Sequence, residues 1–144
     1  MTDKIFVDTN ILVYAYIEDD TNSSNLEKHK KAKEFLNGLS GKEVNISTQI
    51  LNEIYSALKK NGVKDSDSKY YVEYCIEKYN VFPITVLEVK TCLDIRDRYG
   101  YSYWDSLVLG TAINNDCKTV YSEDMQNMQS IYSILKIINP LSTS

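Results

Sequence analysis

The chain has 144 residues, of which 43% are hydrophobic and 25% charged, and its formal net charge is −4. This length predicts one domain with one core, spanning residues 1–144. The acidic balance argues against a broadly basic nucleic-acid binder. No stretch approaches the roughly 20 apolar residues that a membrane span needs, and no charged leader precedes a cleavable apolar segment. We therefore expect a soluble, cytoplasmic protein with no membrane partner.

The first quarter of the chain predicts a strand and two helices. Lys4–Val7 is a β-branched apolar run typical of a strand, and Ile11–Tyr16 is apolar on every side, which predicts a buried helix. Glu18–Asn25 is acidic and rich in Ser and Asn, as expected of a loop. Leu26–Leu39 then repeats apolar residues at helical spacing, which predicts a helix lying on the surface. We expect His29, the only histidine, to be solvated on that helix.

Strands and helices alternate through the rest of the chain. We expect, in order, a strand at 44–47, a helix at 48–60, a helix at 66–79, a strand at 81–84, a helix at 86–99, a helix at 104–115, and strands at 119–121 and 134–138. Strands separated by helices predict an α/β fold with a central parallel sheet of about five strands and helices on both faces.

Four acids occupy comparable places in this pattern. Asp8 follows the first strand, Glu53 lies in the helix at 48–60, Asp105 lies near the start of an apolar helix, and Asp124 comes just after a strand. In parallel α/β sheets, the reactive groups gather at the carboxyl ends of the strands. The pattern therefore favours a site of four converging carboxylates.

Each acid also has a purely structural explanation. Asp8 is suited to cap the helix that follows it. Asp105 lies three residues after Ser102, as the partner acid of a capping box does. Asp124 suits a turn. Glu53 lies away from the apolar face of its helix, so the pattern alone makes it a solvated surface residue.

The residues around the acids favour metal chemistry. Carboxylates without neighbouring His or Cys select hard ions such as Mg²⁺ or Mn²⁺ over zinc. Asn10, two residues after Asp8, and Ser122, two residues before Asp124, are small polar residues suited to orient the carboxylates, or equally to form turns.

These segments together resemble the PIN-domain nucleases. Asp8–Leu12 is similar to the opening motif of that family, Ser47–Glu53 to its second acid segment, Arg98–Ser106 to its third and Val120–Met125 to its fourth. The match spans nearly the whole chain. Its most specific part is Tyr103-Trp104-Asp105-Ser106, which resembles the small VapC-type toxins of toxin–antitoxin pairs.

The resemblance implies a PIN-like three-layer fold and a ribonuclease that hydrolyses RNA phosphodiester bonds with Mg²⁺ or Mn²⁺. By resemblance, the metal-binding and catalytic acids are Asp8, Glu53, Asp105 and Asp124, with Asp124 rather than Glu123 as the fourth. The expected products are 5′-phosphate and 3′-hydroxyl ends. For a toxin, the resemblance also implies a homodimer and a small antitoxin protein whose tail blocks the acids.

The sequence is compatible with several substrate contacts and several functions. Arg96 and Arg98 are candidates for RNA phosphate contacts, and we expect Trp104 to fill the core. A PIN-type nuclease that processes RNA outside a toxin–antitoxin pair fits the same residues. An acid-cluster phosphatase needs a second acid two residues after Asp8, where Asn10 stands. A catalytically silent RNA-binding module is the remaining alternative.

Overall fold

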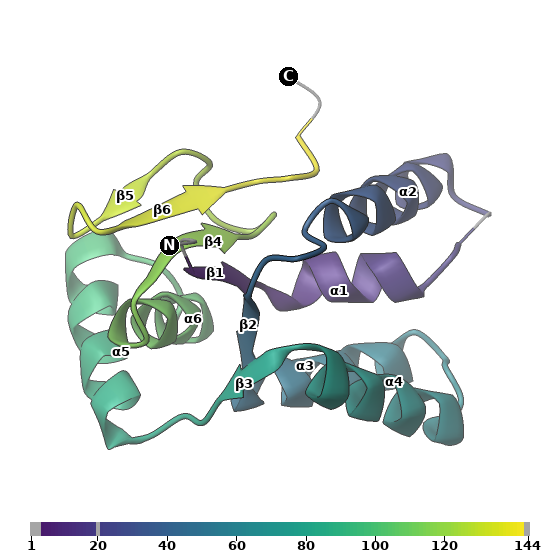
Figure 1. Ribbon diagram of the computed structural model, residues 1–144, viewed down its shortest axis with the longest axis horizontal. Helices are drawn as coiled ribbons and strands as arrows, with labels where there is room; N and C mark the ends of the chain where they lie inside the picture. The colour runs from purple at the N-terminus through teal and green to yellow at the C-terminus, as the bar shows by residue number, and fades with distance from the viewer. Residues whose placement is uncertain (1–3, 20, 143–144) are drawn as a thin grey trace.

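The computed structural model describes residues 4–19 and 21–142. In this part of the chain, the strands form one six-stranded sheet in the order β3-β2-β1-β4-β6-β5 (Figure 1). The strands are β1 (Lys4–Val7), β2 (Val44–Ser47), β3 (Asn80–Phe82), β4 (Cys117–Tyr121), β5 (Ser130–Ile131) and β6 (Leu135–Ile138).

All neighbouring strands run parallel except β5, which pairs antiparallel with β6 at one edge of the sheet. The expected α/β class with a mostly parallel central sheet is confirmed. The short edge strand β5 was not expected from the sequence.

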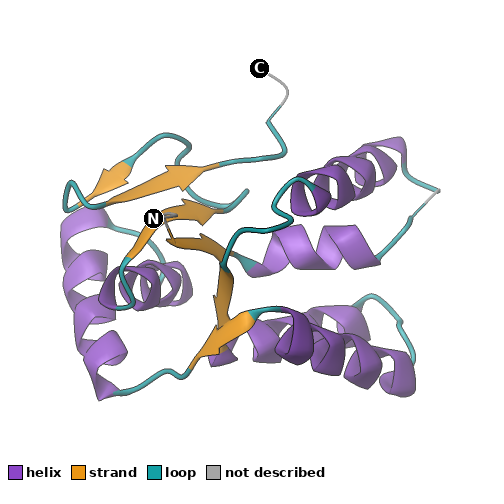
Figure 2. Ribbon diagram, viewed as in Figure 1, coloured by secondary structure: helices purple, strands orange, loops and turns teal. Residues whose placement is uncertain are grey.

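Helices cover both faces of the sheet. The helices are α1 (Thr9–Tyr16), α2 (Ser23–Asn37), α3 (Thr48–Lys60), α4 (Asp65–Lys78), α5 (Val86–Tyr99) and α6 (Tyr103–Asn114). Figure 2 shows α5 and α6 on one side of the sheet and α1 to α4 on the other. No described helix is long and apolar enough to cross a membrane.

The core forms where these layers meet. Phe6 of β1, Ile46 of β2, Val120 of β4 and Ile137 of β6 are fully buried, as the continuous apolar runs of central parallel strands require. Leu109 of α6 joins the same cluster of buried side chains. The central strands β1 and β4 are thus packed in the core, and Asp8 and Asp124 follow their carboxyl ends.

Some boundaries and environments differ from the sequence predictions. Helix α2 begins at Ser23, inside the expected loop, because the Asn22 side chain accepts a hydrogen bond from the Asn25 amide at 3.1 Å and caps the helix there. His29 is buried rather than solvated, and its Nδ1 lies 2.7 Å from the carbonyl oxygen of Tyr14. Helix α1 is buried only in its first half, at Thr9, Ile11 and Leu12, whereas the second half is partly exposed.

Candidate metal centre

Three aspartates from three separate segments converge at the carboxyl edge of the sheet. Asp8 follows β1 and Asp124 follows β4, and these two strands are parallel neighbours. Asp105 lies in the first turn of α6. Each aspartate offers one carboxylate oxygen, and these three oxygens lie within 4.8 Å of one another. A distance of this order between oxygens allows one cation to contact all three.

Asp8 is the buried member of the group, with 4% of its surface exposed. Its Oδ1 accepts a hydrogen bond from the Thr9 amide at 2.8 Å, which caps α1, and its Oδ2 accepts from the Ser122 hydroxyl at 2.8 Å. Both sequence interpretations of Asp8 therefore hold geometrically, because the capping residue is also a member of the acid group.

Burial raises the pKa of Asp8 from its ordinary value of 3.8 to about 7. The two hydrogen bonds oppose this rise, while the charges of Asp105 and Glu53 add to it. The carboxylate is thus held by neutral donors, and no described residue forms an ion pair with it.

Glu53 lies on the second turn of α3 and faces this group rather than bulk solvent. It is half-buried, its Oε1 accepts a hydrogen bond from the Thr9 hydroxyl at 2.7 Å, and its Oε2 accepts from Nε2 of Gln49 at 3.3 Å. Its negative charge raises the pKa of Asp8, Asp105 and Asp124. The prediction of a solvated surface glutamate was wrong, because Glu53 points along the edge where α3 meets α1.

Asp124 and its neighbour Glu123 have different partners. Asp124 accepts a hydrogen bond from the Asn10 side-chain amide at 2.5 Å, and its own backbone amide donates to the Ser122 hydroxyl at 3.2 Å. Glu123 instead forms an ion pair with Lys28 at 2.9 Å and accepts from the Tyr14 hydroxyl. Lys28 therefore balances the charge of Glu123, whereas the Asp124 carboxylate lies with those of Asp8 and Asp105.

Asp105 is fixed through its backbone. Its amide donates to the Ser102 hydroxyl at 3.1 Å, so Ser102 caps α6 as the Ser-x-x-acid pattern predicts. Partial burial raises the pKa of the Asp105 carboxyl, and the charges of Asp124 and Glu53 raise it further. A hydrogen bond between the Ser102 side chain and the Asp105 carboxylate lowers the pKa of that carboxyl, but the other contributions outweigh it.

The residues after β1 contact three of the four acids. Asp8 is itself a member, the Thr9 hydroxyl holds Glu53, and the Asn10 amide holds Asp124. The sequence had suggested Asn10 and Ser122 as orienting residues, and each does donate to one acid. The roles of Thr9 and Gln49 were missed, because neither residue carries a charge that would single it out.

The two candidate arginines lie on α5 and contact other parts of the chain. Arg96 donates to the carbonyl oxygen of Tyr101 at 2.8 Å. Arg98 pairs with Asp94 at 3.3 Å, and its guanidinium lies 5.4 Å from the ring centre of Tyr132. Within the described residues, neither forms an ion pair with any of the four acids, so their assignment to substrate remains a prediction.

Trp104 is 60% exposed, which contradicts the expectation that it fills the core. It is the second residue of α6, and the helix is buried on all sides only from Ser106 to Ala112. The apolar sequence of α6 gave no hint of an outward direction at Trp104, because the buried side begins only two residues later.

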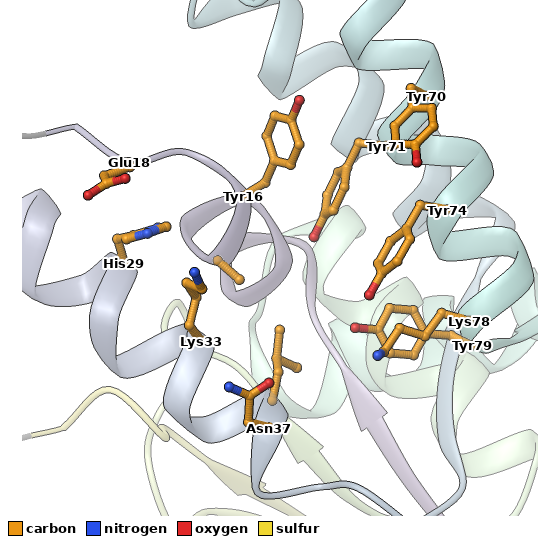
Figure 3. Close-up of a pocket in the computed structure, with 12 residues that line it drawn as sticks. Tyr16, Glu18, His29, Lys33, Asn37, Tyr70, Tyr71, Tyr74, Lys78 and Tyr79 are labelled. Carbon is orange, nitrogen blue, oxygen red and sulfur yellow. The ribbon is translucent and has the colours of Figure 1, made fainter.

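A separate cavity of about 470 Å³ lies between the end of α1, α2 and α4. Figure 3 shows Tyr71 and Tyr74 of α4 across the cavity from Lys33 and Asn37 of α2, with Tyr70 at the upper rim. None of the four acids lines this cavity. It is a second concave surface with a tyrosine-rich wall, and it is distinct from the acid edge.

The donor set at the acid edge suits a hard divalent cation. All the converging groups are carboxylates, three of them have a pKa raised by burial and mutual repulsion, and Asn10 and Ser122 fix their orientation. Oxygen ligands of this kind are those that Mg²⁺ and Mn²⁺ prefer. The fold and this edge therefore define an α/β protein with an acidic cluster fitted to bind a divalent metal.

The family profile of the PIN domain matches residues 5–131 of this sequence, and the chain belongs to the PIN domain family. The resemblance noted in the sequence is thereby confirmed. No curated protein matches the chain by sequence.

Solved structures of toxins have the same fold. A toxin–antitoxin complex from Klebsiella pneumoniae aligns with a TM-score of 0.68 and 17% identity, covering 94% of this chain and 97% of its own. The sarcin–ricin loop cleaving toxin VapC20 of Mycobacterium tuberculosis aligns with a TM-score of 0.66 and 16% identity, covering 83% of this chain and 89% of its own. VapBC2 of Rickettsia felis, bound to a promoter DNA fragment, aligns with a TM-score of 0.64 and 17% identity, covering 93% of this chain and 96% of its own.

Proposed function

We propose that this chain is a divalent-metal-dependent endoribonuclease and that it acts as the toxin of a toxin–antitoxin pair. The observation that carries the proposal is the convergence of Asp8, Asp105 and Asp124, with Glu53 beside them, at the carboxyl edge of a PIN fold. The similar structures include a toxin described as cleaving the sarcin–ricin loop, which supports RNA as the substrate class.

The four acids would hold Mg²⁺ or Mn²⁺. When bound, such an ion lowers the pKa of a water molecule, orients it for in-line attack and offsets charge on the leaving oxygen. In the hydrolysis, the water oxygen forms a bond to phosphorus, the bond from phosphorus to the 3′ oxygen breaks, and that oxygen takes up a proton. The products are a 5′-phosphate and a 3′-hydroxyl, and no covalent enzyme intermediate forms.

The contribution of the protein is to fix the acids before the substrate arrives. The Thr9 amide and the Ser122 hydroxyl hold the two oxygens of Asp8, the Thr9 hydroxyl holds Glu53, and the Asn10 amide holds Asp124. Groups that orient metal ligands in this way typically matter roughly 10–100-fold for metal affinity or activity.

The proposed partners are RNA, a small antitoxin and a second copy of the chain. Similar structures are described as toxin–antitoxin complexes, some of them bound to DNA. An antitoxin whose tail reaches the acid edge would block it. Induced expression with and without the neighbouring open reading frame tests for an antitoxin, and light scattering tests for the homodimer. Toxicity that the neighbouring frame does not relieve would favour a PIN nuclease of RNA processing instead.

The test of the nuclease is metal-dependent cleavage of RNA by the purified chain. We expect cleavage with Mg²⁺ or Mn²⁺ that a chelator abolishes, and mapped ends that carry a 5′-phosphate. Asp8→Asn and Asp124→Asn should each lower the rate by more than about 100-fold, because even groups that only orient a ligand cost roughly 10–100-fold.

The matched control is Glu123→Gln. It removes an acid next to Asp124, but one whose charge Lys28 already balances, so most of the activity should remain. Unchanged cleavage in Asp8→Asn would overturn the assignment. Hydrolysis of small phosphomonoesters without RNA cleavage would favour the phosphatase, and metal-independent RNA binding without cleavage would favour the silent module.

A further inference from the structure

A cavity of about 520 Å³ is lined by Glu53 and by Trp104, the residue before Asp105. It lies between the first half of α3, the first turn of α6 and the segment that joins β3 to α5. Its volume is in the range of pockets that take small organic groups. Its lining includes Gln49, Asn52, Glu53, Ser56, Trp104 and Leu107.

Trp104 gives this cavity an aromatic wall. Its side chain is 60% exposed, and its ring packs edge-on against Tyr103 with 5.0 Å between ring centres. Its carbonyl oxygen accepts a hydrogen bond from Nε2 of Gln49 at 3.0 Å. A single exposed aromatic residue is ordinary on a protein surface. This one borders a cavity, and the hydrogen bond from Gln49 fixes its backbone against α3, so an exposed indole face is available to a flat partner.

Gln49 links the cavity to the acids and has an unused acceptor. Its Nε2 donates both to the Trp104 carbonyl oxygen and to the Glu53 carboxylate. These two contacts fix the orientation of the amide, because a flipped amide would place Oε1, an acceptor, against both of these acceptors. Its Oε1 is buried and accepts no hydrogen bond from any described residue. A buried acceptor without a donor costs free energy. Because Gln49 lines the cavity, a bound molecule that brings a donor group to this oxygen would remove that cost.

Asn52 and Ser56 provide polar groups on the exposed side of the cavity. They lie one turn apart on α3, and both are exposed. The Asn52 amide makes no hydrogen bond with any other described side chain, so its donors and its acceptor are available. An amide of this kind can pair with the edge of a nucleobase.

The charge of the cavity selects against a phosphate. No lysine or arginine is among the residues that line it, and Glu53 lies at its end toward the acids. A phosphate group would meet one negative charge and no positive one. A neutral, flat group with hydrogen-bonding edges meets an indole face, the apolar side chain of Leu107 and free amide groups.

We propose that this cavity is a nucleobase subsite that holds an unpaired base of the RNA next to the phosphate that is cleaved. Trp104 stacks on the base, and Asn52 and Gln49 hydrogen-bond to its edge. Trp104 directly precedes Asp105, and Glu53 lines the cavity while its charge acts on the three aspartates. A nucleotide whose phosphate lies at the acids therefore has its base within reach of the cavity. This proposal rests on the proposed ribonuclease function, but its first test does not need cleavage.

Trp104 is the only tryptophan in the chain, so its fluorescence reports on the cavity directly. The purified protein is titrated, with a chelator present, with AMP, GMP, CMP and UMP, and with ribose 5-phosphate as the probe that lacks a base. We expect a saturable change in emission with at least one nucleotide and none with ribose 5-phosphate. Asn52→Ala should weaken that nucleotide about tenfold. No change with any nucleotide would overturn the proposal.

The second test is cleavage by variants of Trp104. Trp104→Ala should raise KM for RNA about tenfold with little change in kcat, as expected when stacking on the substrate is lost. Trp104→Phe should restore most of the affinity, because it keeps an aromatic face. Tyr70→Ala removes an aromatic residue that is 70% exposed on α4, away from the acids, and should leave KM unchanged.

The two proposals fail in different ways. Saturable nucleotide binding without any RNA cleavage would leave the subsite standing and overturn the nuclease. Cleavage with an unchanged KM in Trp104→Ala would leave the nuclease standing and overturn the subsite. A change in oligomeric mass in Trp104→Ala, with KM unchanged, would assign the indole to a protein interface and also overturn the subsite.

Discussion

Asp8 shows how one residue can serve the fold and the site together. Its hydrogen bonds from Thr9 and Ser122 place it at the start of α1 and against the end of β4. The same position buries a carboxylate beside Asp105 and Glu53, which raises its pKa to about 7. Near neutral pH, the charged form of Asp8 therefore lowers the free energy of unfolding of the metal-free protein, and a bound cation would offset this loss.

This cost predicts a pH-dependent stabilisation by Asp8→Asn in the metal-free protein. The folded-state pKa lies above the unfolded value, so the free energy of unfolding of the wild type falls as the pH rises from about 4 to 7. Asparagine keeps the cap and avoids the charge. We expect the variant to melt roughly 3–10 °C above the wild type at pH 8, with the gap closing below pH 5. A gap that is independent of pH would contradict the burial of a charged Asp8.

At this scale, the sequence located the acids but not the direction of every side chain. Asp8 and Asp124 could be placed at one edge, because each follows a strand of a parallel sheet. Glu53 could not, because helical periodicity separates core from surface but does not mark the rim of a cleft. Trp104 was misplaced for a related reason. An apolar helix predicts burial as a whole, and nothing local shows that its first turn reaches past the core.

At the scale of elements, α6 is the helix that sets Asp105 against the sheet. It packs on α5 through Gly110, where an added Cβ would lie 3.1 Å from the Cys92 backbone nitrogen and 3.4 Å from the Glu88 carbonyl oxygen. These are backbone atoms of a neighbouring helix, so they cannot rotate away. The close approach of the two helices therefore depends on the absence of a side chain at Gly110.

Gly110→Ala should destabilise the fold despite the better helix propensity of alanine. Overpacking typically costs about 1–3 kcal/mol, and the propensity gain offsets at most about 1 kcal/mol of it. Urea unfolding should show a lower midpoint with an unchanged slope. Ser66→Ala, at an exposed position of α4, is the control and should stay within about 0.5 kcal/mol of the wild type. Equal stability of Gly110→Ala and the wild type would show that α5 can shift.

The elements that the sequence predicted well are those with long or strongly apolar patterns. Strands β1 and β2 and helix α3 have the expected bounds, because an apolar run or a clear helical face defines each of them. Strand β5 was missed, because it has two residues and depends on a turn in which Tyr132 and Ser133 adopt positive φ angles. Such a turn at residues other than glycine leaves no signal in the sequence.

At the scale of the whole molecule, where the net charge is −4, the acids differ in how their charges are balanced. Several acids are balanced within the chain, as Glu123 is by Lys28 and Asp65 by Lys69. The acids at the sheet edge are instead held by neutral donors, namely Thr9, Asn10 and Ser122. The edge where a negatively charged RNA would have to bind therefore carries acids that form no ion pair with any described residue.

A divalent cation should consequently stabilise the whole fold. A ligand that binds only the folded state at about 100 times its Kd adds about 2.7 kcal/mol, which corresponds to roughly 5–10 °C for a chain of this size. We expect Mn²⁺ or Mg²⁺ to raise the melting temperature of the wild type in a saturable way, and NaCl at equal ionic strength to have little effect, because screening does not place a charge between the acids.

Two single-charge variants separate binding at the acid edge from general neutralisation of the chain. Asp105→Asn removes a carboxylate from the converging group, so the metal-induced rise in melting temperature should be largely lost. Glu123→Gln changes the net charge by the same amount at an acid that Lys28 already balances, so the rise should remain. Equal rises in both variants would mean that divalent cations act on the overall negative charge. The acid edge would then not be a metal centre, however closely its oxygens converge.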